Sequence, residues 1–261
     1  MNARSIAAVN RLPDEHKRAV YARFIPEALR ERFGIAQTFR DPEGHDLLTL
    51  RCAAGATDVV VDLRHMHTAQ DPLLYAHLSD TITGQVHVLL YIVNDPESPR
   101  FDVDRMPDGS ATEFGTFRRN LEAESAALHA GLAPVQVRRG LRVLSHAIPA
   151  FEDFVASLGH DMYFVEPLAY HNAVVFERYG FAYQQGLRRM HAIHAGFQPG
   201  GELHARLDAS SPFRMPAMGS SIRGRSWAIH DGILGHPYTE ITMYKRVGAH
   251  SGIDTFPGGE W

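Results

Sequence analysis

Two histidines separated by one residue, His65 and His67, are the first group with metal-binding chemistry. They end a run of alternating residues, Asp58–His67, that predicts a β-strand. Side chains two apart in a strand share a face, so both imidazoles could bind one metal ion, with His77 or His87 on a neighbouring strand as a third ligand. The alternative is that these are structural histidines hydrogen-bonded within the sheet. We prefer this alternative, because the spacing matches no zinc motif.

A second histidine group begins at His191 and His194, whose spacing places them on one face of a helix. Together with a downstream carboxylate they could form a site of two or three imidazoles and an acid. The sequence has neither HExxH nor an H-x-D pattern here, so we favour unrelated surface histidines. The downstream residues considered are Glu202, His204, His230, Asp231 and His236.

An arginine-rich turn precedes an apolar-striped segment and offers phosphate-binding chemistry. A turn that opens a helix exposes backbone N–H groups at the positive end of the helix dipole, and guanidinium groups add charge-assisted hydrogen bonds. The alternative is an ordinary helix start in which Gly140 makes the turn. The residues of this candidate phosphate site are Val137, Arg138, Arg139, Gly140, Leu141 and Arg142.

A fourth group surrounds Trp227 in a long segment rich in loop residues. Arg225 is two residues away, and Arg214 and Arg223 lie nearby. Arginine beside an aromatic ring can hold a planar or anionic ligand. The alternative is that Trp227 is buried and anchors the segment, with the arginines paired to carboxylates. The sequence leaves both alternatives open.

Composition limits the class of protein. Of the 261 residues, 44% are hydrophobic and 21% charged, as is usual for a globular protein. The net charge of −4 argues against nucleic acid or an anionic membrane as partner. The single cysteine, Cys52, excludes an intramolecular disulfide framework and, without an apolar leader or membrane span, suggests a cytoplasmic protein.

Hydrophobic periodicity predicts the elements that must position these groups. A helix should begin near Pro13 and be interrupted at Pro26, and another should follow an Asn120 cap. Period-two alternation predicts an antiparallel meander. A helix, a strand and a second helix should then span Val137–Phe181, before an insertion at about 188–238 and a closing strand over Thr239–Val247. The meander strands are predicted at Leu47–Cys52, Asp58–His67, Leu73–Asp80 and Gln85–Asn94.

The segment Val137–Phe181 resembles the acyl-CoA N-acyltransferase (GNAT) superfamily. The superfamily has a glycine-containing pyrophosphate loop, then a short strand, matched here by Tyr163-Phe164-Val165, and a helix ending in an aromatic-x-x-x-Gly-Phe pattern, matched by Phe176–Phe181. Phe176 replaces the tyrosine that often serves as general acid. The resemblance implies an α+β fold with a mixed, mostly antiparallel central sheet flanked by helices, in one domain over residues 1–261.

The resemblance also implies a reaction, the direct transfer of an acyl group from a coenzyme A thioester to an amine. Acetyl-CoA or another acyl-CoA would be the co-substrate, held by the arginine-rich turn with Asn172, and a small-molecule or peptide amine would be the acceptor. Glu166 and His171 are the candidate bases, with Glu113 as a further carboxylate. A metal ion is the less favoured cofactor, and a homodimer is one option for the oligomeric state.

Two alternative functions remain open at this point. The chain could keep the acyltransferase fold as a ligand-binding or interaction protein without catalysis, which the phenylalanine at position 176 favours. It could also be a metal-dependent enzyme, since sixteen histidines are many for this length.

Overall fold

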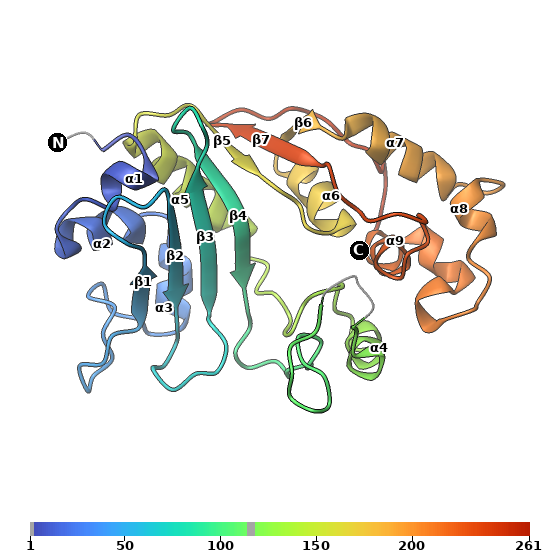
Figure 1. Ribbon diagram of the computed structural model, residues 1–261, viewed down its shortest axis with the longest axis horizontal. Coiled ribbons are helices and arrows are strands. Elements are labelled where there is room, and N and C mark those ends of the chain that lie inside the picture. The colour runs from blue at the N-terminus through green and yellow to red at the C-terminus, as the bar shows by residue number, and fades with distance from the viewer. Residues whose placement is uncertain (1–2, 114–117) are drawn as a thin grey trace. The chain divides into compact units, whose positions relative to one another are not determined.

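The computed structural model describes residues 3–113 and 118–261. The fold is α+β, with a seven-stranded mixed sheet in the order β1-β2-β3-β4-β5-β7-β6 and helices flanking it (Figure 1). Within the described residues, none of the helices combines the length and apolar character needed to cross a bilayer.

The first four strands form the predicted antiparallel meander. Each strand pairs with the next, and alternate residues on β2 and β3 are buried, as expected for strands with one face on a core. The prediction for the second strand was four residues too long, because β2 ends at Leu63 and His65 and His67 lie in the following bend. The strands are β1 (Leu48–Arg51), β2 (Asp58–Leu63), β3 (Leu74–Asp80) and β4 (Val86–Val93).

The chain divides into two compact units, and neither is a continuous stretch of sequence. Unit 1 contains residues 1–97, 140–166 and 244–250, and unit 2 contains residues 98–139, 167–243 and 251–261. Strand β5 (Met162–Val165) belongs to unit 1 and β6 (Ala182–Gln185) to unit 2, while β7 (Thr242–Arg246) begins in unit 2 and ends in unit 1. The expectation of a single domain remains a prediction.

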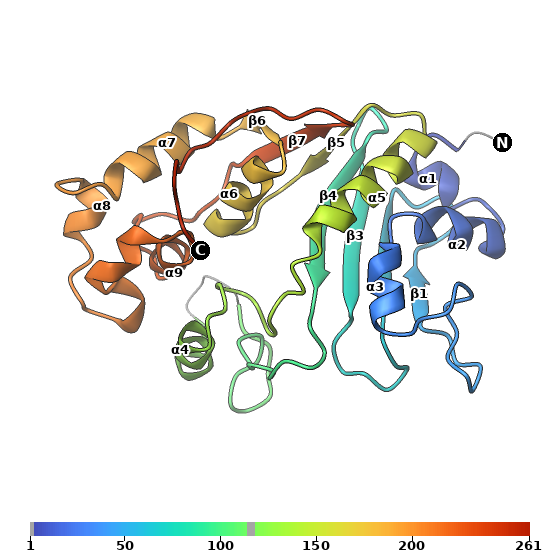
Figure 2. The same cartoon turned by 180° about the vertical axis from the view of Figure 1, so that it is seen from behind.

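In unit 1, helices cover one face of the meander (Figure 2). The predicted break at Pro26 is present: α2 (Asp14–Ala22) ends before it and α3 (Glu27–Arg32) begins after it, while α1 (Ile6–Val9) precedes both. Phe24, between α2 and α3, packs against Phe154 of α5 (Leu144–Ser157) with ring centroids 5.3 Å apart. The rings of Phe151 of α5 and Tyr163 of β5 pack with their centroids 4.9 Å apart. An aromatic core therefore fixes α5 against β5.

Unit 2 is mostly helical. Trp227 is fully buried, stacks on Phe213 with ring centroids 5.0 Å apart, and donates its indole N–H to the carbonyl of Leu132 at 2.8 Å. The predicted cap is present, because the side chain of Asn120 accepts from the N–H of Ala123 at the start of α4. The helices are α4 (Leu121–His129), α6 (Tyr170–Arg178), α7 (Leu187–Gly196), α8 (Glu202–Ala205), α9 (Ile222–His230) and the 3-10 turns η1 (Pro212–Arg214) and η2 (Pro216–Ser220).

Candidate functional site

Strands β4 and β5 form a parallel pair in unit 1, and they pair over a very short length. His87 is opposite Phe164 and Val88 is opposite Val165. The N–H of Glu166 donates to the carbonyl of Val88 at 3.4 Å, and β4 then continues to Val93 while β5 has ended. Figure 1 shows β5 diverging from β4 in this direction. The last residues of β4 therefore lack β5 as a neighbour along the sheet.

A β-bulge lies on β4 at the same level. Leu78 of β3 is opposite Val88 and His77 is opposite Leu90, so Leu89 is the extra residue on β4. A bulge bends its strand and changes the directions of the local N–H group and side chains. The irregular backbone of β4 thus coincides with the point at which β4 and β5 part.

His87 and Glu166 lie together at this point. Nε2 of His87 is 3.5 Å from Oε1 of Glu166, within ion-pair distance but without a hydrogen bond. Burial lowers the pKa of His87, and the charge of Glu166 opposes that shift. The His87 side chain is 18% exposed and that of Glu166 is 47% exposed. A neutral imidazole beside an accessible carboxylate is suited to accept a proton.

Tyr91 is another polar group on β4 beyond the bulge. Its hydroxyl oxygen is buried and has no hydrogen-bond partner among the residues described. Burial raises the pKa of Tyr91, so the phenol remains protonated at neutral pH. Buried hydroxyl groups are normally hydrogen-bonded, so an unsatisfied one is a candidate ligand contact. Its position on β4 was not predicted as a site.

The predicted phosphate turn leads into α5, although Gly140 does not make the turn. Gly140 forms an isolated antiparallel bridge with Asn94, and the left-handed residue is Arg142, with φ of 56°. Leu141 is buried and Arg142 is exposed. The backbone N–H groups of 143–145 donate to no described residue, and no side chain caps α5. The start of α5 thus has free donors in its first turn.

The preceding part of the turn belongs to unit 2. Arg138 donates to the carbonyl of Ser98, and the N–H of Arg139 donates to the hydroxyl of Ser98 at 3.2 Å. The carbonyl of Val137 accepts from the N–H of Phe101 at 2.8 Å. These contacts attach the segment to its own unit, and the side chain of Arg139 is exposed.

The other predicted base, His171, is on α6 in unit 2 and is buried. Its Nδ1 lies 2.8 Å from the hydroxyl oxygen of Ser226 on α9. Burial, with a smaller contribution from His230, lowers the pKa of His171 to about 3. The adjacent Asn172 has a buried side-chain oxygen without a partner among the described residues. The third carboxylate considered, Glu113, is exposed in an irregular segment.

The arginines around Trp227 anchor their segment. Arg214 binds Asp231, Arg223 donates to the carbonyl of Gly131 at 2.9 Å, and Arg225 lies over the ring of Phe256 at 3.6 Å. These contacts agree with the anchoring alternative. Two histidines of the second candidate metal group contact other side chains: His194 contacts Arg225, and His230 contacts Glu124.

The two histidines first considered as metal ligands make different contacts. His65 lies near Phe33, with ring centroids 6.4 Å apart, whereas His67 contacts Asp41 and stacks on His45. Asp41 and His45 were not predicted as part of a site. Their spacing of four residues, around Pro-Glu-Gly, was the one local signal that a turn could bring them together.

No protein-family model, curated protein or solved structure matches this chain.

Proposed function

We propose that the protein is an acyl-CoA-dependent N-acyltransferase. The observation that carries this proposal is the parallel pairing of β4 with β5 over two residue pairs, followed by divergence of the strands. In the superfamily that the sequence resembles, the acyl thioester is expected where this strand pair parts. The order of the seven strands and the position of α5 between β4 and β5 in the chain support the same proposal.

The first turn of α5 would take the pyrophosphate of coenzyme A. The free N–H groups of residues 143–145 are suited to phosphate oxygens, and the helix dipole favours negative charge there. Arg142 is exposed immediately before the helix and would add a charge-assisted bond. All of these groups belong to unit 1.

The reacting groups would lie beside the bulge in β4. The Glu166 carboxylate, with His87 beside it, would accept the proton that the amine loses as it attacks the thioester carbonyl. The N–H of Leu89 is the proposed donor to the carbonyl oxygen, because the bulge changes its direction.

Binding is the first test. Acetyl-CoA and free coenzyme A are titrated into purified protein by calorimetry, and the titration is repeated with Arg142→Ala. The matched control is Arg246→Ala, an exposed arginine that pairs with Asp161 in the same unit. We expect binding that weakens in the first variant and is unchanged in the second. Absence of binding by folded wild-type protein would overturn the proposal.

Turnover is the second test. Release of free thiol from acetyl-CoA is measured with a panel of small amines and peptide amino termini, for Glu166→Gln and for Glu15→Gln, an exposed carboxylate on α2. Loss of a general base typically lowers the rate by about 10²–10⁴-fold, so we expect a loss of that order in the first variant with coenzyme A affinity retained. An unchanged rate would exclude Glu166 as the base.

A second candidate function is ligand binding without catalysis. Phe176, which takes the place of the superfamily's frequent general acid, favours it, and its ring packs on Phe181 with centroids 4.9 Å apart. Coenzyme A binding without thiol release for any amine tested would favour this function over acyl transfer.

A further inference from the structure

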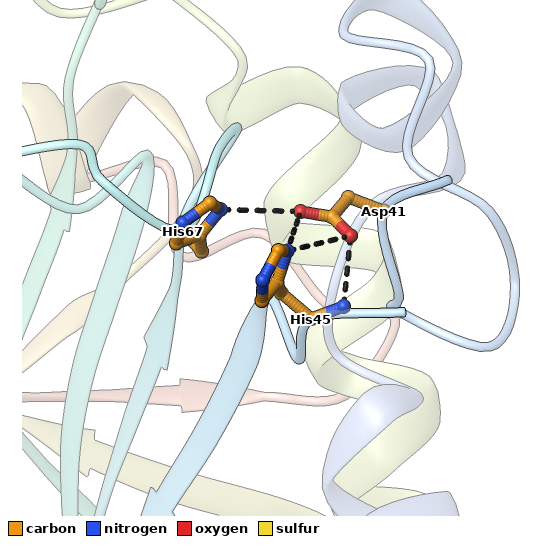
Figure 3. Close-up of side chains that lie close together, drawn as sticks. All are labelled: Asp41, His45 and His67. Atoms are coloured by element: carbon orange, nitrogen blue, oxygen red, sulfur yellow. Dashed lines mark hydrogen bonds and ion pairs between the residues drawn. The ribbon is translucent and has the colours of Figure 1, made fainter. Parts of the chain in front are cut away.

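A cluster of one carboxylate and two imidazoles lies in unit 1, on two loops beside the meander (Figure 3). Nδ1 of His45 is 2.9 Å from Oδ2 of Asp41, and Nδ1 of His67 is 3.2 Å from the same oxygen. The two rings stack with centroids 3.9 Å apart and an interplanar angle of 24°. Three potential ligand atoms therefore converge within 4.8 Å of one another.

The loop that carries Asp41 and His45 is a closed turn. The N–H of Asp41 donates to the carbonyl of His45 at 3.0 Å, and the N–H of His45 donates to Oδ1 of Asp41 at 2.8 Å. The backbones of Arg40 and Asp46 form an isolated antiparallel β-bridge, and the guanidinium of Arg40 donates to the carbonyl of Gly44 at 3.0 Å. Asp41 and His45 therefore lie in the same turn, and hydrogen bonds within the turn fix its shape.

The loop that carries His67 is attached to the same region. The N–H of Arg64 donates to the carbonyl of Leu47 at 2.9 Å, and the N–H of Leu47 donates to the carbonyl of Phe39 at 2.8 Å. The guanidinium of Arg64 also donates to the carbonyl of Ala69 at 2.7 Å, across the loop. Backbone contacts therefore position the two loops before any ligand binds.

We propose that Asp41, His45 and His67 bind a divalent first-row transition-metal ion such as Zn²⁺. Bonds of about 2.0–2.2 Å from such an ion to nitrogen and oxygen ligands place neighbouring ligand atoms roughly 3 Å apart, close to the two nitrogen–oxygen distances observed. Two imidazoles and one carboxylate suit zinc, nickel, copper or cobalt, whereas Ca²⁺ and Mg²⁺ prefer oxygen ligands.

The ion would replace the hydrogen bonds that now join the cluster, and the two stacked rings would have to turn so that the ion lies in the plane of each. Each Nδ1 must bind the metal as a lone-pair donor, so the proton of each neutral ring then resides on Nε2. The side chains of His45 and His67 are 48% and 44% exposed, which leaves the remaining coordination positions to water. This inference does not depend on the acyltransferase proposal.

The test uses untagged full-length protein freed of metal with a chelator and dialysed. Zn²⁺ affinity is measured by competition with a chromophoric chelator, and Co²⁺ is titrated with visible absorption to report its coordination. The variants are His45→Ala, His67→Ala and Asp41→Asn. The matched control is His77→Ala, which removes another partly exposed histidine paired with a carboxylate, Asp58 at 3.4 Å.

We expect one equivalent of Zn²⁺ to bind the wild type. Because loss of an outer-shell partner alone typically costs about 10–100-fold in metal affinity, loss of a ligand should weaken binding at least about tenfold, whereas the control should bind as the wild type does. Circular dichroism verifies folding of each variant. Long-range ¹H–¹⁵N spectra should show His45 and His67 changing to the Nε2–H tautomer when Zn²⁺ is added.

Two outcomes would overturn the proposal. In the first, metal-free wild-type protein takes up no stoichiometric Zn²⁺, so Asp41 and the two histidines form a hydrogen-bonded cluster and nothing more. In the second, His45→Ala and His67→Ala retain wild-type affinity, so the ion binds elsewhere among the histidines.

Discussion

Nε2 of His87 lies 3.5 Å from Oε1 of Glu166, where strands β4 and β5 cease to pair. Burial lowers the pKa of His87, and the negative charge of Glu166 raises it in part. The protonation of the imidazole at neutral pH therefore depends first on its burial, and the solvent-accessible carboxylate opposes that effect.

Removal of that charge should lower the pKa of His87 further. With Glu166→Gln only burial still acts on the imidazole, so the histidine should titrate at a lower pH than in the wild type. A titration of the His87 ring protons by NMR measures the shift, and Glu15→Gln provides an exposed control. An unchanged or higher pKa in Glu166→Gln would show that the two groups are not coupled.

Glu124 should be essential to the stability of unit 2. Burial acts to raise its pKa, but hydrogen bonds from His230 and Arg119 outweigh it, so the pKa lies below its ordinary value. Glu124→Gln leaves both partners without that charge, and breaking a buried pair costs about 3–5 kcal/mol. Urea unfolding at pH 7 measures the loss.

The pH dependence of the same variant has a definite sign. A carboxylate with a lowered pKa in the folded protein contributes stability above its unfolded pKa and loses it as the pH falls through the folded value. The difference between wild type and Glu124→Gln should therefore shrink in acid. Glu122→Gln, an exposed neighbour on α4, should change little at any pH. A constant difference down to acid pH would contradict the linkage.

His171 should make the protein less stable as the pH falls. Its folded pKa is about 3, so between that value and its unfolded pKa near 6.5 the unfolded state binds the additional proton. Lowering the pH from 7 to 5 should cost on the order of 1–2 kcal/mol through this group alone. His171→Gln can still hydrogen-bond to Ser226 and cannot be charged, so it should lose that part of the dependence.

The measurement is the difference in unfolding free energy between wild type and His171→Gln at pH 7, 6 and 5. Groups common to both proteins cancel in this difference. His77→Gln is the control, because His77 is on β3 and its side chain is 32% exposed. A His171→Gln curve parallel to that of the wild type would show that His171 gains its proton while folded.

Gly186 should tolerate no side chain. It precedes α7 with φ of 99°, and a Cβ atom there would lie 2.4 Å from Cδ1 of Ile241 and 3.0 Å from the carbonyl oxygen of Glu240. Gly186→Ala should cost at least about 1–3 kcal/mol of stability from backbone strain, with the steric contact in addition. Gly248→Ala shares a left-handed backbone, with φ of 68° and no atom near the added carbon. Thermal unfolding of both variants separates the cost of backbone strain from that of the steric contact. An equal loss of stability in the two variants would contradict the steric contribution.

The sequence predicted those features that depend on local periodicity. Alternating residues indicated the meander, which the strand pairings confirm, and Asn120 indicated the start of α4. Pro26 indicated the break between α2 and α3, because proline cannot continue a helix without losing a hydrogen bond. Local patterns of this kind involve neighbours within a few residues, so they can be recognised without an alignment.

The rest depended on contacts between distant residues. Strand β2 ends at Leu63, and His67 in the loop that follows contacts Asp41 in another loop. Both features depend on the hydrogen bonds that hold the two loops together, and residue spacing along the chain does not predict those bonds. The burial of His171 against Ser226 joins residues 55 positions apart. The left-handed backbone at Arg142 was also missed, because glycine is the usual signal for that conformation.

The order of segments in unit 1 has a consequence for synthesis of the chain. Its last segment, 244–250, follows most of unit 2, and Lys245 within it pairs with Glu152 of α5 at 2.9 Å. A ribosome must therefore translate residues 167–243 of unit 2 before unit 1 has all of its parts. For the same reason, no single cut yields either unit complete, and limited proteolysis in residues 167–243 would leave fragments that must remain associated for unit 1 to persist.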